Sequence, residues 1–292
     1  NILKQYNNNS NFFTMIANKY TILSKIGEGN FSTVYKGSKK NEDVAIKFEN
    51  ENSELKLLKH ETSMLNYLYS KGSKQTPYVY FYGLHQNIST LIIPYYECSL
   101  EDYCENNEIP NNWFITMLET LHVIHHLGVI HRDIKPQNFM IKQNSVYLID
   151  FGLSTIYIDD DYSHVPEKHM EYILGTPKFI SIHVHNGISP SRRDDLISLM
   201  YIYSYIKHKV LLWSNVSDEE DEYQPNHILH NLNQKRKQLK DFFQNNVKDF
   251  EKKIMDYVYS IDYKEQPHYH WLISIFEEHQ DKKTNNNYDE II

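Results

Sequence analysis

The sequence is poor in cysteine and contains no long apolar run. Two of its 292 residues are cysteines, too few for a disulfide framework, so we expect a reducing compartment. No stretch approaches the about 18 apolar residues that a membrane span needs, and the N-terminus lacks the pattern of a secretion signal. We therefore expect a soluble intracellular protein of the cytoplasm or nucleus, with no membrane partner.

An excess of basic residues is also absent. The formal net charge is −8, and the 30 Lys and Arg residues are scattered apart from one short cluster at 235–237. Nucleic acids attract proteins that present a basic face, so we expect no nucleic-acid partner. With 40% hydrophobic residues, the chain has ample material for the core of a globular enzyme, and we expect a monomer.

The first third of the chain is predicted to form a small sheet with one helix. Short runs of strand-forming residues alternate with turns, and one segment carries leucines at helical spacing. The expected strands are 20–26, 33–36, 43–49, 79–84 and 89–94, and the expected helix is 53–69.

The remainder of the chain is predicted to be helical, so the fold class is α+β. Apolar residues recur at helical spacing after Ser99. The expected helices are 100–104, 113–127 and 194–206, with weaker ones to residue 278. An Asn-rich head, 1–17, and a polar tail, 281–292, are expected to lie outside the fold, and the acidic stretch 217–223 is expected to be a loop.

A glycine-containing turn joins the first two strands. Glycine leaves room for backbone N–H groups to approach phosphate oxygens, but an ordinary hairpin turn would look much the same. The strand that follows carries Val44-Ala-Ile-Lys47, and this order indicates a lysine that pairs with nucleotide phosphates. Glu61, 14 residues later in the expected helix, can neutralise that lysine.

The segment from His131 to Asn138 reads His-Arg-Asp-Ile-Lys-Pro-Gln-Asn, and Asp150-Phe-Gly follows 12 residues later. Phosphoryl transfer requires a carboxylate that accepts the hydroxyl proton, oxygen ligands for Mg²⁺, and cations on the developing charge. Asp133 meets the first need, and Asn138 with Asp150 meets the second. The cations are Lys135 and Lys47.

These motifs, with Gly175-Thr-Pro-Lys-Phe-Ile-Ser-Ile-His183, Gly187-Ile188 and Ser191-Arg-Arg-Asp-Asp-Leu196, resemble the casein kinase 1 family. The resemblance covers about residues 18–279. It implies a bilobal serine/threonine kinase that uses ATP and Mg²⁺ on protein substrates. The implied boundaries are an N-lobe at 18–94, a hinge at 94–98 and a C-lobe at 99–280.

The resemblance also assigns roles to individual residues. Asp195 would support the catalytic loop from a buried helix, and Thr176 would bridge Asp133 and Lys135. Ile93 would be the gatekeeper, and the Pro94 carbonyl and Tyr96 N–H would face adenine. The residues expected to bind ATP are Ile26, Gly27, Glu28, Gly29, Asn30, Phe31, Ser32, Thr33, Val34, Ala45, Lys47, Ile93, Pro94, Tyr95, Tyr96 and Met140.

Two further sets of residues leave alternatives open. Lys178 and Arg192 would form an anion pocket that favours acidic or phosphorylated substrates, whereas ordinary ion pairs to Asp194 or Glu171 explain Arg192 equally well. His122 and His126 have the spacing of a metal pair but no third ligand, so we expect them to pack a helix near the catalytic loop.

Two other classes of protein are alternatives to an active kinase. A catalytically dead nucleotide-binding scaffold is favoured only by Ser32, which stands where most kinases have the third glycine of the loop. A nucleic-acid-binding protein would need a basic face. The chain ends about a dozen residues after the last expected helix, so we expect no long regulatory tail, and the composition suits a kinase of a large DNA virus or a protist.

Overall fold

The computed structural model describes residues 15–29, 31–50, 56–208 and 249–289, and of Asn111, His208, Asp249 and residues 280–289 it describes the backbone alone. The chain divides into two compact units, with a boundary between Tyr96 and Glu97. The first unit also excludes Lys71–Thr76, which belongs to the second. This boundary lies within the segment that was expected to be a hinge. The acidic stretch at 217–223 lies outside the described residues.

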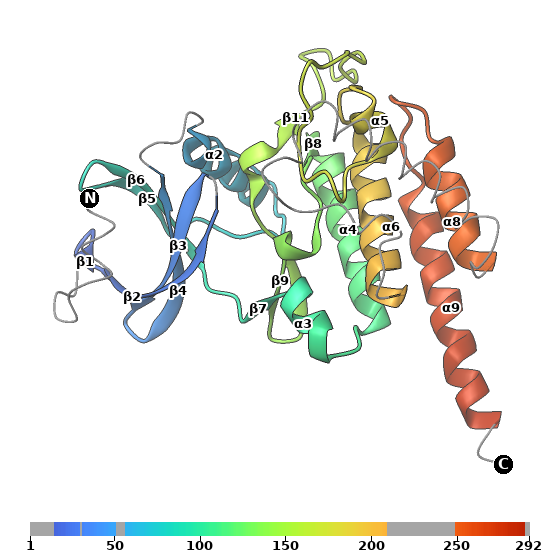
Figure 1. The fold of residues 1–292 in the computed structure, drawn as a ribbon, viewed down its shortest axis with the longest axis horizontal. Coiled ribbons are helices and arrows are strands. Elements are labelled where there is room, and N and C mark those ends of the chain that lie inside the picture. Colours follow the sequence, from blue (N-terminus) through green and yellow to red (C-terminus); the bar gives the residue numbers. More distant parts are fainter. Residues whose placement is uncertain (1–14, 30, 51–55, 209–248, 290–292) are drawn as a thin grey trace. The chain divides into compact units, whose positions relative to one another are not determined.

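The first unit contains an antiparallel sheet in the order β1-β2-β3-β4-β6-β5 (Figure 1). Its core lies on one face, where Val44 and Ile46 are fully buried and pack with Phe48, Tyr35 and Ile92. The strands are β1 Met15–Ile16, β2 Tyr20–Glu28, β3 Ser32–Lys39, β4 Glu42–Glu49, β5 Phe81–His85 and β6 Ile88–Pro94.

The sheet begins earlier than expected. Met15–Ile16 pairs with Tyr20 and Thr21 of β2, and the Ile16 side chain is 1% exposed in the core. The expectation that the fold starts at residue 18 was therefore wrong by one short strand, because an apolar residue in a polar head still gains by burial. Residues 1–14 lie outside the described part of the chain.

Helix α2, Leu57–Ser70, packs against β6 within the same unit. Leu58, Leu65 and Leu68 are buried on one side of the helix, as the leucine spacing predicted. The first turn receives a cap from the sheet, because the Leu58 N–H donates to Glu49 Oε1 at 3.1 Å. A carboxylate at this position also interacts favourably with the positive end of the helix dipole.

The second unit is mainly helical, and α4 stands at its centre, in contact with α6 and α9 (Figure 1). Leu121 and Ile124 of α4 are fully buried. The helices are α3 Leu100–Asn106, α4 Asn111–His126, α5 Ile182–His185, α6 Arg192–His208, α8 Asp249–Ser260 and α9 Tyr269–Asp289. The predicted α+β class, with a small sheet and one helix followed by a helical part, is confirmed.

Two small antiparallel sheets complete the second unit. Their strands are β7 Cys98–Ser99, β8 Val129–Ile130, β9 Phe139–Lys142, β10 Ser145–Leu148 and β11 Thr155–Ile156. They pair in the orders β10-β9-β7 and β11-β8. The loop 131–138, which carries candidate site residues, begins after β8 of one sheet and ends before β9 of the other.

Helix α9 continues to Asp289, so the expected polar tail from residue 281 is helical over most of its length. The segment contains neither glycine nor proline, and polarity alone does not end a helix. None of the described helices combines the length and the apolar character that crossing a lipid bilayer requires.

Candidate active site

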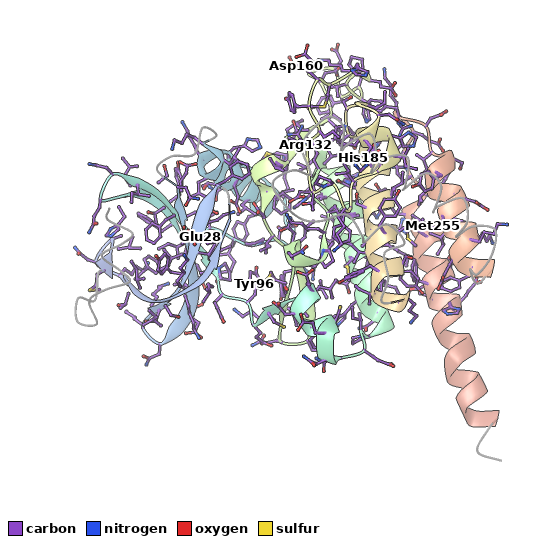
Figure 2. All side chains as sticks on the ribbon, in the orientation of Figure 1. Glu28, Tyr96, Arg132, Asp160, His185 and Met255 are labelled. Carbon is purple, nitrogen blue, oxygen red and sulfur yellow. The ribbon has the colours of Figure 1, made fainter. Side chains whose placement is uncertain are left out.

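The glycine-containing turn lies in the first unit between β2 and β3, where Glu28 marks the end of β2 (Figure 2). The Gly29 N–H donates to the Ser32 carbonyl at 2.9 Å and closes the turn. Ser32 begins β3 opposite Glu49 and has no positive φ, so its backbone does not need the missing third glycine. Asn30, expected to bind ATP, lies outside the described residues.

The two glycines of this turn are not required by the packing of the protein. A Cβ added at Gly27 or Gly29 would meet no described heavy atom closer than 3.9 Å. At Gly37, by contrast, it would come within 2.7 Å of the Thr21 carbonyl oxygen and closer still to Ile46, so that glycine is structural. The space beside Gly27 and Gly29 therefore suits the close approach of a phosphate group to the backbone.

Asn50 holds this turn from the end of β4. Its Nδ2 donates to the Gly29 carbonyl at 2.9 Å, and its Oδ1 accepts a hydrogen bond from Thr33 Oγ1 at 3.1 Å. Its backbone N–H donates to the Phe31 carbonyl at 2.9 Å. Sequence reasoning missed this residue, since an Asn after a strand is usually only a turn signal.

Lys47 and Glu61 form a buried ion pair within the first unit. The Lys47 Nζ lies 2.8 Å from Glu61 Oε2, and the two side chains are 14% and 2% exposed. Strand β4 presents the lysine and helix α2 presents the glutamate. Strand β4 is therefore joined to helix α2 twice, by the ion pair of Lys47 with Glu61 and by the cap that Glu49 provides.

The other residues expected to bind ATP are divided between the units. Val34 lies opposite Lys47 in the β3–β4 ladder, and Ala45 lies opposite Ile93 in the β4–β6 ladder. Ile26 and Phe31 are exposed, whereas Ile93 and Tyr96 are buried. Pro94 ends β6, Tyr95 follows it, and Met140 pairs with Ser99 in the second unit.

The candidate catalytic loop, 131–138, follows β8 in the second unit and is supported by α6. Asp195 of α6 is 2% exposed. Its Oδ2 accepts a hydrogen bond from the His131 N–H at 2.7 Å, and its Oδ1 accepts one from the Arg132 N–H at 2.9 Å. His125 of α4 contacts the same carboxylate through Nε2 at 2.9 Å.

These hydrogen bonds set the ionisation of Asp195. Burial on its own would raise the pKa of this carboxyl group, but the hydrogen bonds from His125 and the His131 N–H, with the electrostatic effect of these two histidines, hold its pKa below the ordinary value. Asp195 is therefore a buried anion that fixes two consecutive N–H groups of the loop.

Arg132 and His131 connect the loop with the segment on either side of Asp150. Arg132 has φ +70°, a left-handed conformation that costs energy for a residue with a side chain, and it lies among the loops of the helical unit (Figure 2). Its guanidinium donates to the Leu153 and Ser154 carbonyls. His131 Nε2 donates to the Ile149 carbonyl at 2.9 Å. Sequence reasoning gave these two residues no separate role.

Three side chains converge on Asp133. Its Oδ1 accepts hydrogen bonds from the Thr176 hydroxyl at 2.7 Å and from the Thr176 N–H at 3.0 Å. Its Oδ2 lies 2.8 Å from Lys135 Nζ and accepts a hydrogen bond from Asn138 Nδ2 at 3.1 Å. Lys135 Nζ also donates to Thr176 Oγ1 at 3.0 Å, so the carboxylate, hydroxyl and ammonium groups form a closed ring.

Asn138 and Asp150 offer the oxygen atoms that Mg²⁺ prefers. The Asn138 amide nitrogen donates hydrogen bonds to Asp133, so the amide oxygen is the atom of this side chain that could bind a metal ion. The Ile149 N–H donates to the Asn138 carbonyl at 2.9 Å, so the two expected ligands are held close along the backbone. Asp150 itself has φ +63°, an uncommon conformation that Asp tolerates better than most residues.

Lys178 and Arg192 have different neighbours. The Lys178 ammonium lies 5.6 Å from the centre of the Tyr205 ring, and its side chain is half-buried. Arg192 is buried and donates hydrogen bonds to Tyr157 Oη and the Lys264 carbonyl. Neither of the ion pairs considered for Arg192, to Asp194 or Glu171, is formed; the arginine near Asp194 is Arg193, at 3.7 Å.

Comparison with known proteins identifies relatives over most of the chain. A family model described as the protein kinase domain matches residues 20–272. Casein kinase I homolog 2 of Schizosaccharomyces pombe is 30% identical over 276 residues, which cover 89% of this chain and 62% of the relative. A probable casein kinase I homolog of Encephalitozoon cuniculi is 31% identical over 278 residues, covering 88% of this chain and 84% of that protein. This chain thus spans about three fifths of the length of the first relative.

Proposed function

Because the chain belongs to the casein kinase I family of protein kinases, we propose that it transfers the γ-phosphoryl group of ATP to serine and threonine hydroxyls of protein substrates. The observation that carries this proposal is the ring around Asp133, in which Thr176, Lys135 and Asn138 orient one carboxylate. That arrangement suits a group that must accept a proton from an alcohol at a fixed position.

In the first unit, the proposed task is to hold the donor phosphates. Lys47 supplies a cation that Glu61 keeps in place, and the turn at Gly27 and Gly29 leaves its backbone open to phosphate oxygens. Mg²⁺, held by Asn138 and Asp150 when bound, would neutralise the charge on the transferred group.

In the second unit, the proposed task is to orient the acceptor. Asp133 would take the proton of the serine or threonine hydroxyl. Lys135 lies beside the same carboxylate, where its ammonium group would stabilise negative charge on the transferred phosphoryl group. Thr176 holds both side chains and leaves neither free to turn away.

We further propose that acidic or phosphorylated residues near the acceptor favour a substrate, and that Lys178 contributes to this preference. Lys178 lies two residues after Thr176, in the segment that contacts Asp133. Arg192 is the weaker candidate for this role because its guanidinium is buried and already bonded.

The test combines phosphate transfer with nucleotide binding. With Mg-ATP and a Ser/Thr-containing protein, the natural chain should incorporate phosphate on serine or threonine. Asp133→Asn should lower the rate by about 10²–10⁴, because the amide keeps the shape and cannot take the proton. Asp256→Asn, an exposed change on α8, is the matched control and should leave the rate unchanged.

Thermal unfolding of the same proteins separates the alternatives. A ligand at a hundredfold excess over its dissociation constant stabilises the folded protein by about 2.7 kcal/mol, so Mg-ATP should stabilise both the natural chain and Asp133→Asn. Stabilisation of the natural chain without phosphate transfer would instead identify a nucleotide-binding scaffold. Absence of both effects would contradict the proposal.

A further inference from the structure

A cavity of about 370 Å³ lies within the second unit and gathers basic side chains. It is open to solvent and is lined by the C-terminal end of α4, the segment 157–164, the first turn of α6 and the residues at the start of α9 and just before it. The residues that matter are Arg192, Lys264, His126, His164, Tyr157 and Tyr269. Among the described residues that line it, there is no aspartate or glutamate.

Arg192 is the buried charge of this cavity. The residue is 9% exposed, and its guanidinium is held by Tyr157 Oη at 3.2 Å and by the Lys264 carbonyl at 2.6 Å. Within the described part of the chain no carboxylate forms an ion pair with it, and its Nε is buried without a hydrogen-bond partner. Arginine remains charged in proteins, and a buried charge is normally paired.

Neither acidic residue in the first turn of α6 supplies that pair, since Asp194 lies near Arg193 instead, at 3.7 Å. Asp195, three residues after Arg192, gives its oxygens to His125 and to the N–H groups of His131 and Arg132. Its carboxylate is therefore bonded to the catalytic loop and to His125. The positive charge of Arg192 in the cavity wall forms no ion pair with any described residue.

Two histidines of the cavity wall have lowered pKa values, and the uncompensated charge contributes to one of them, His164. Burial lowers the pKa of His164, and the positive charges of Arg192 and Lys264 lower it further. Burial also lowers the pKa of His122, another residue of the cavity wall, with smaller contributions from nearby histidines. Burial, and to a smaller extent the positive groups nearby, therefore disfavour the protonated form of both side chains.

We propose that this cavity is a binding site for a tetrahedral oxyanion such as a phosphate group. An anion would compensate Arg192, would accept hydrogen bonds from Lys264 and His126 at the mouth, and would favour protonation of His164. A divalent cation fits poorly, since Arg192 and Lys264 would repel it. The site differs from the proposed substrate pocket, because Lys178 is not among the residues that line it.

The oxyanion has two possible sources with the same chemistry. It is either a free inorganic anion or a phosphorylated side chain of a protein. The cavity volume lies in the range of small-ligand sites, so it accommodates the anion together with the group that carries it. The binding experiment therefore needs both kinds of probe.

The first probe is sodium sulfate, which does not titrate near neutral pH, measured by thermal unfolding against sodium chloride of equal ionic strength. Sulfate should raise the unfolding temperature of the natural chain with saturation. Lys264→Gln should weaken sulfate binding by about tenfold or more, the effect of losing one charge-assisted hydrogen bond. Lys252→Gln, an exposed lysine on α8 with the same charge change, is the matched control and should bind as the natural chain does.

The second probe is a peptide with one phosphoserine, compared with its unphosphorylated form and with inorganic phosphate. Binding of the phosphopeptide more tightly than phosphate, with the same loss in Lys264→Gln, would support a phosphorylated protein as the source. Tighter binding of phosphate, with that loss, would support a free anion.

Two results would overturn the proposal. One is no saturable effect of sulfate beyond that of chloride on the natural chain. The other is an equal effect in Lys264→Gln and Lys252→Gln, which would place sulfate elsewhere, including at the active site. The measurement uses no ATP and no phosphate transfer, so its failure is independent of the proposed kinase activity.

Discussion

The hydroxyl group of Thr176 donates a 2.7 Å hydrogen bond to Asp133 Oδ1, from a position 43 residues further along the chain. The Thr176 N–H donates to the same oxygen at 3.0 Å, so the backbone and the side chain of one residue fix one side of the carboxylate. Lys135 fixes the other side. The segment that carries Thr176 is therefore a part of the proposed active site, and its position controls the orientation of Asp133.

The hydroxyl of Thr176 can be removed with little change in shape. Thr176→Val leaves Asp133 with one fewer hydrogen bond and leaves Lys135 without one of its acceptors. Loss of a charge-assisted hydrogen bond costs about 1.5–3 kcal/mol, so we expect kcat to fall by roughly 10- to 150-fold in a phosphate-transfer assay. Thr176→Ser keeps the hydroxyl and should retain most of the activity. Equal rates for the two variants would show that the hydroxyl has no role in orientation.

Asp195 should contribute to stability as well as to the geometry of the loop. Asp195→Asn replaces one acceptor oxygen by an amide group that faces backbone N–H donors. We expect the free energy of unfolding to fall by about 1.5–3 kcal/mol, measured by urea titration. Asp256→Asn on the exposed side of α8 should change it by less than about 0.5 kcal/mol. Similar values for both variants would contradict the support assigned to Asp195.

Asn50 should act on nucleotide binding through the turn at Gly29. Asn50→Ala removes the hydrogen bonds to the Gly29 carbonyl and Thr33 but leaves Lys47 and Glu61 in place. We expect the KM for ATP to rise severalfold with a smaller change in kcat, since the role proposed for the turn is to hold ATP and not the acceptor. Asn66→Ala, on the exposed side of α2, is the control. A fall in kcat at unchanged KM would contradict this assignment.

Much of the fold could be predicted from the sequence because the periodic patterns were strong. The strands around Lys47 and the helix that carries Glu61 were found from alternation and leucine spacing, and the structure brings the two residues together. The polar ends were misjudged because composition does not show whether a short apolar segment reaches a core. Ile16 is such a case, since two residues suffice to extend the sheet.

The candidate site, like the fold, could be predicted from the sequence only in part. Motif spacing indicated Asp133, Asn138 and Asp150, because their chemistry requires those residue types in that order. The bonds that Asn50 and Glu49 make could not be predicted, since each depends on where a side chain lies in three dimensions. The hydrogen-bond partners of Arg192 could not be predicted from the sequence for the same reason. The sequence left Arg192 open between an anion pocket and an ion pair to Asp194 or Glu171, whereas its hydrogen bonds go to Tyr157 and the Lys264 carbonyl.

The pH dependence of stability should begin in the range where histidines titrate. Burial lowers the pKa of His85, His122 and His164 below the value of about 6.5 expected in the unfolded chain. Below that value the unfolded chain binds more protons, so the stability that is complete at pH 7.5 is lost as the pH falls. We expect the urea midpoint to decrease between about pH 7 and pH 5.5, before carboxylates protonate. A midpoint that stays constant over this interval would contradict the assigned shifts.

The last prediction separates Lys178 from Arg192 as the source of the proposed preference for acidic substrates. Lys178 is half-buried and close in sequence to Thr176, so its ammonium group is suited to pair with a phosphate or carboxylate on a bound peptide. Lys178→Ala should lower kcat/KM on peptides with a phosphorylated or acidic residue near the acceptor by roughly 10- to 150-fold, and should leave neutral peptides almost unchanged, because only the charged peptide loses a charge-assisted bond. Lys178→Arg, which keeps the charge, should retain much of the preference, and Lys168→Ala is the control for an exposed lysine in the same unit.

Arg192→Ala should instead lower the free energy of unfolding, because its guanidinium joins Tyr157 to the Lys264 carbonyl. Equal losses on phosphorylated and neutral peptides in Lys178→Ala would exclude this lysine from substrate selection and would leave the proposed kinase activity untouched.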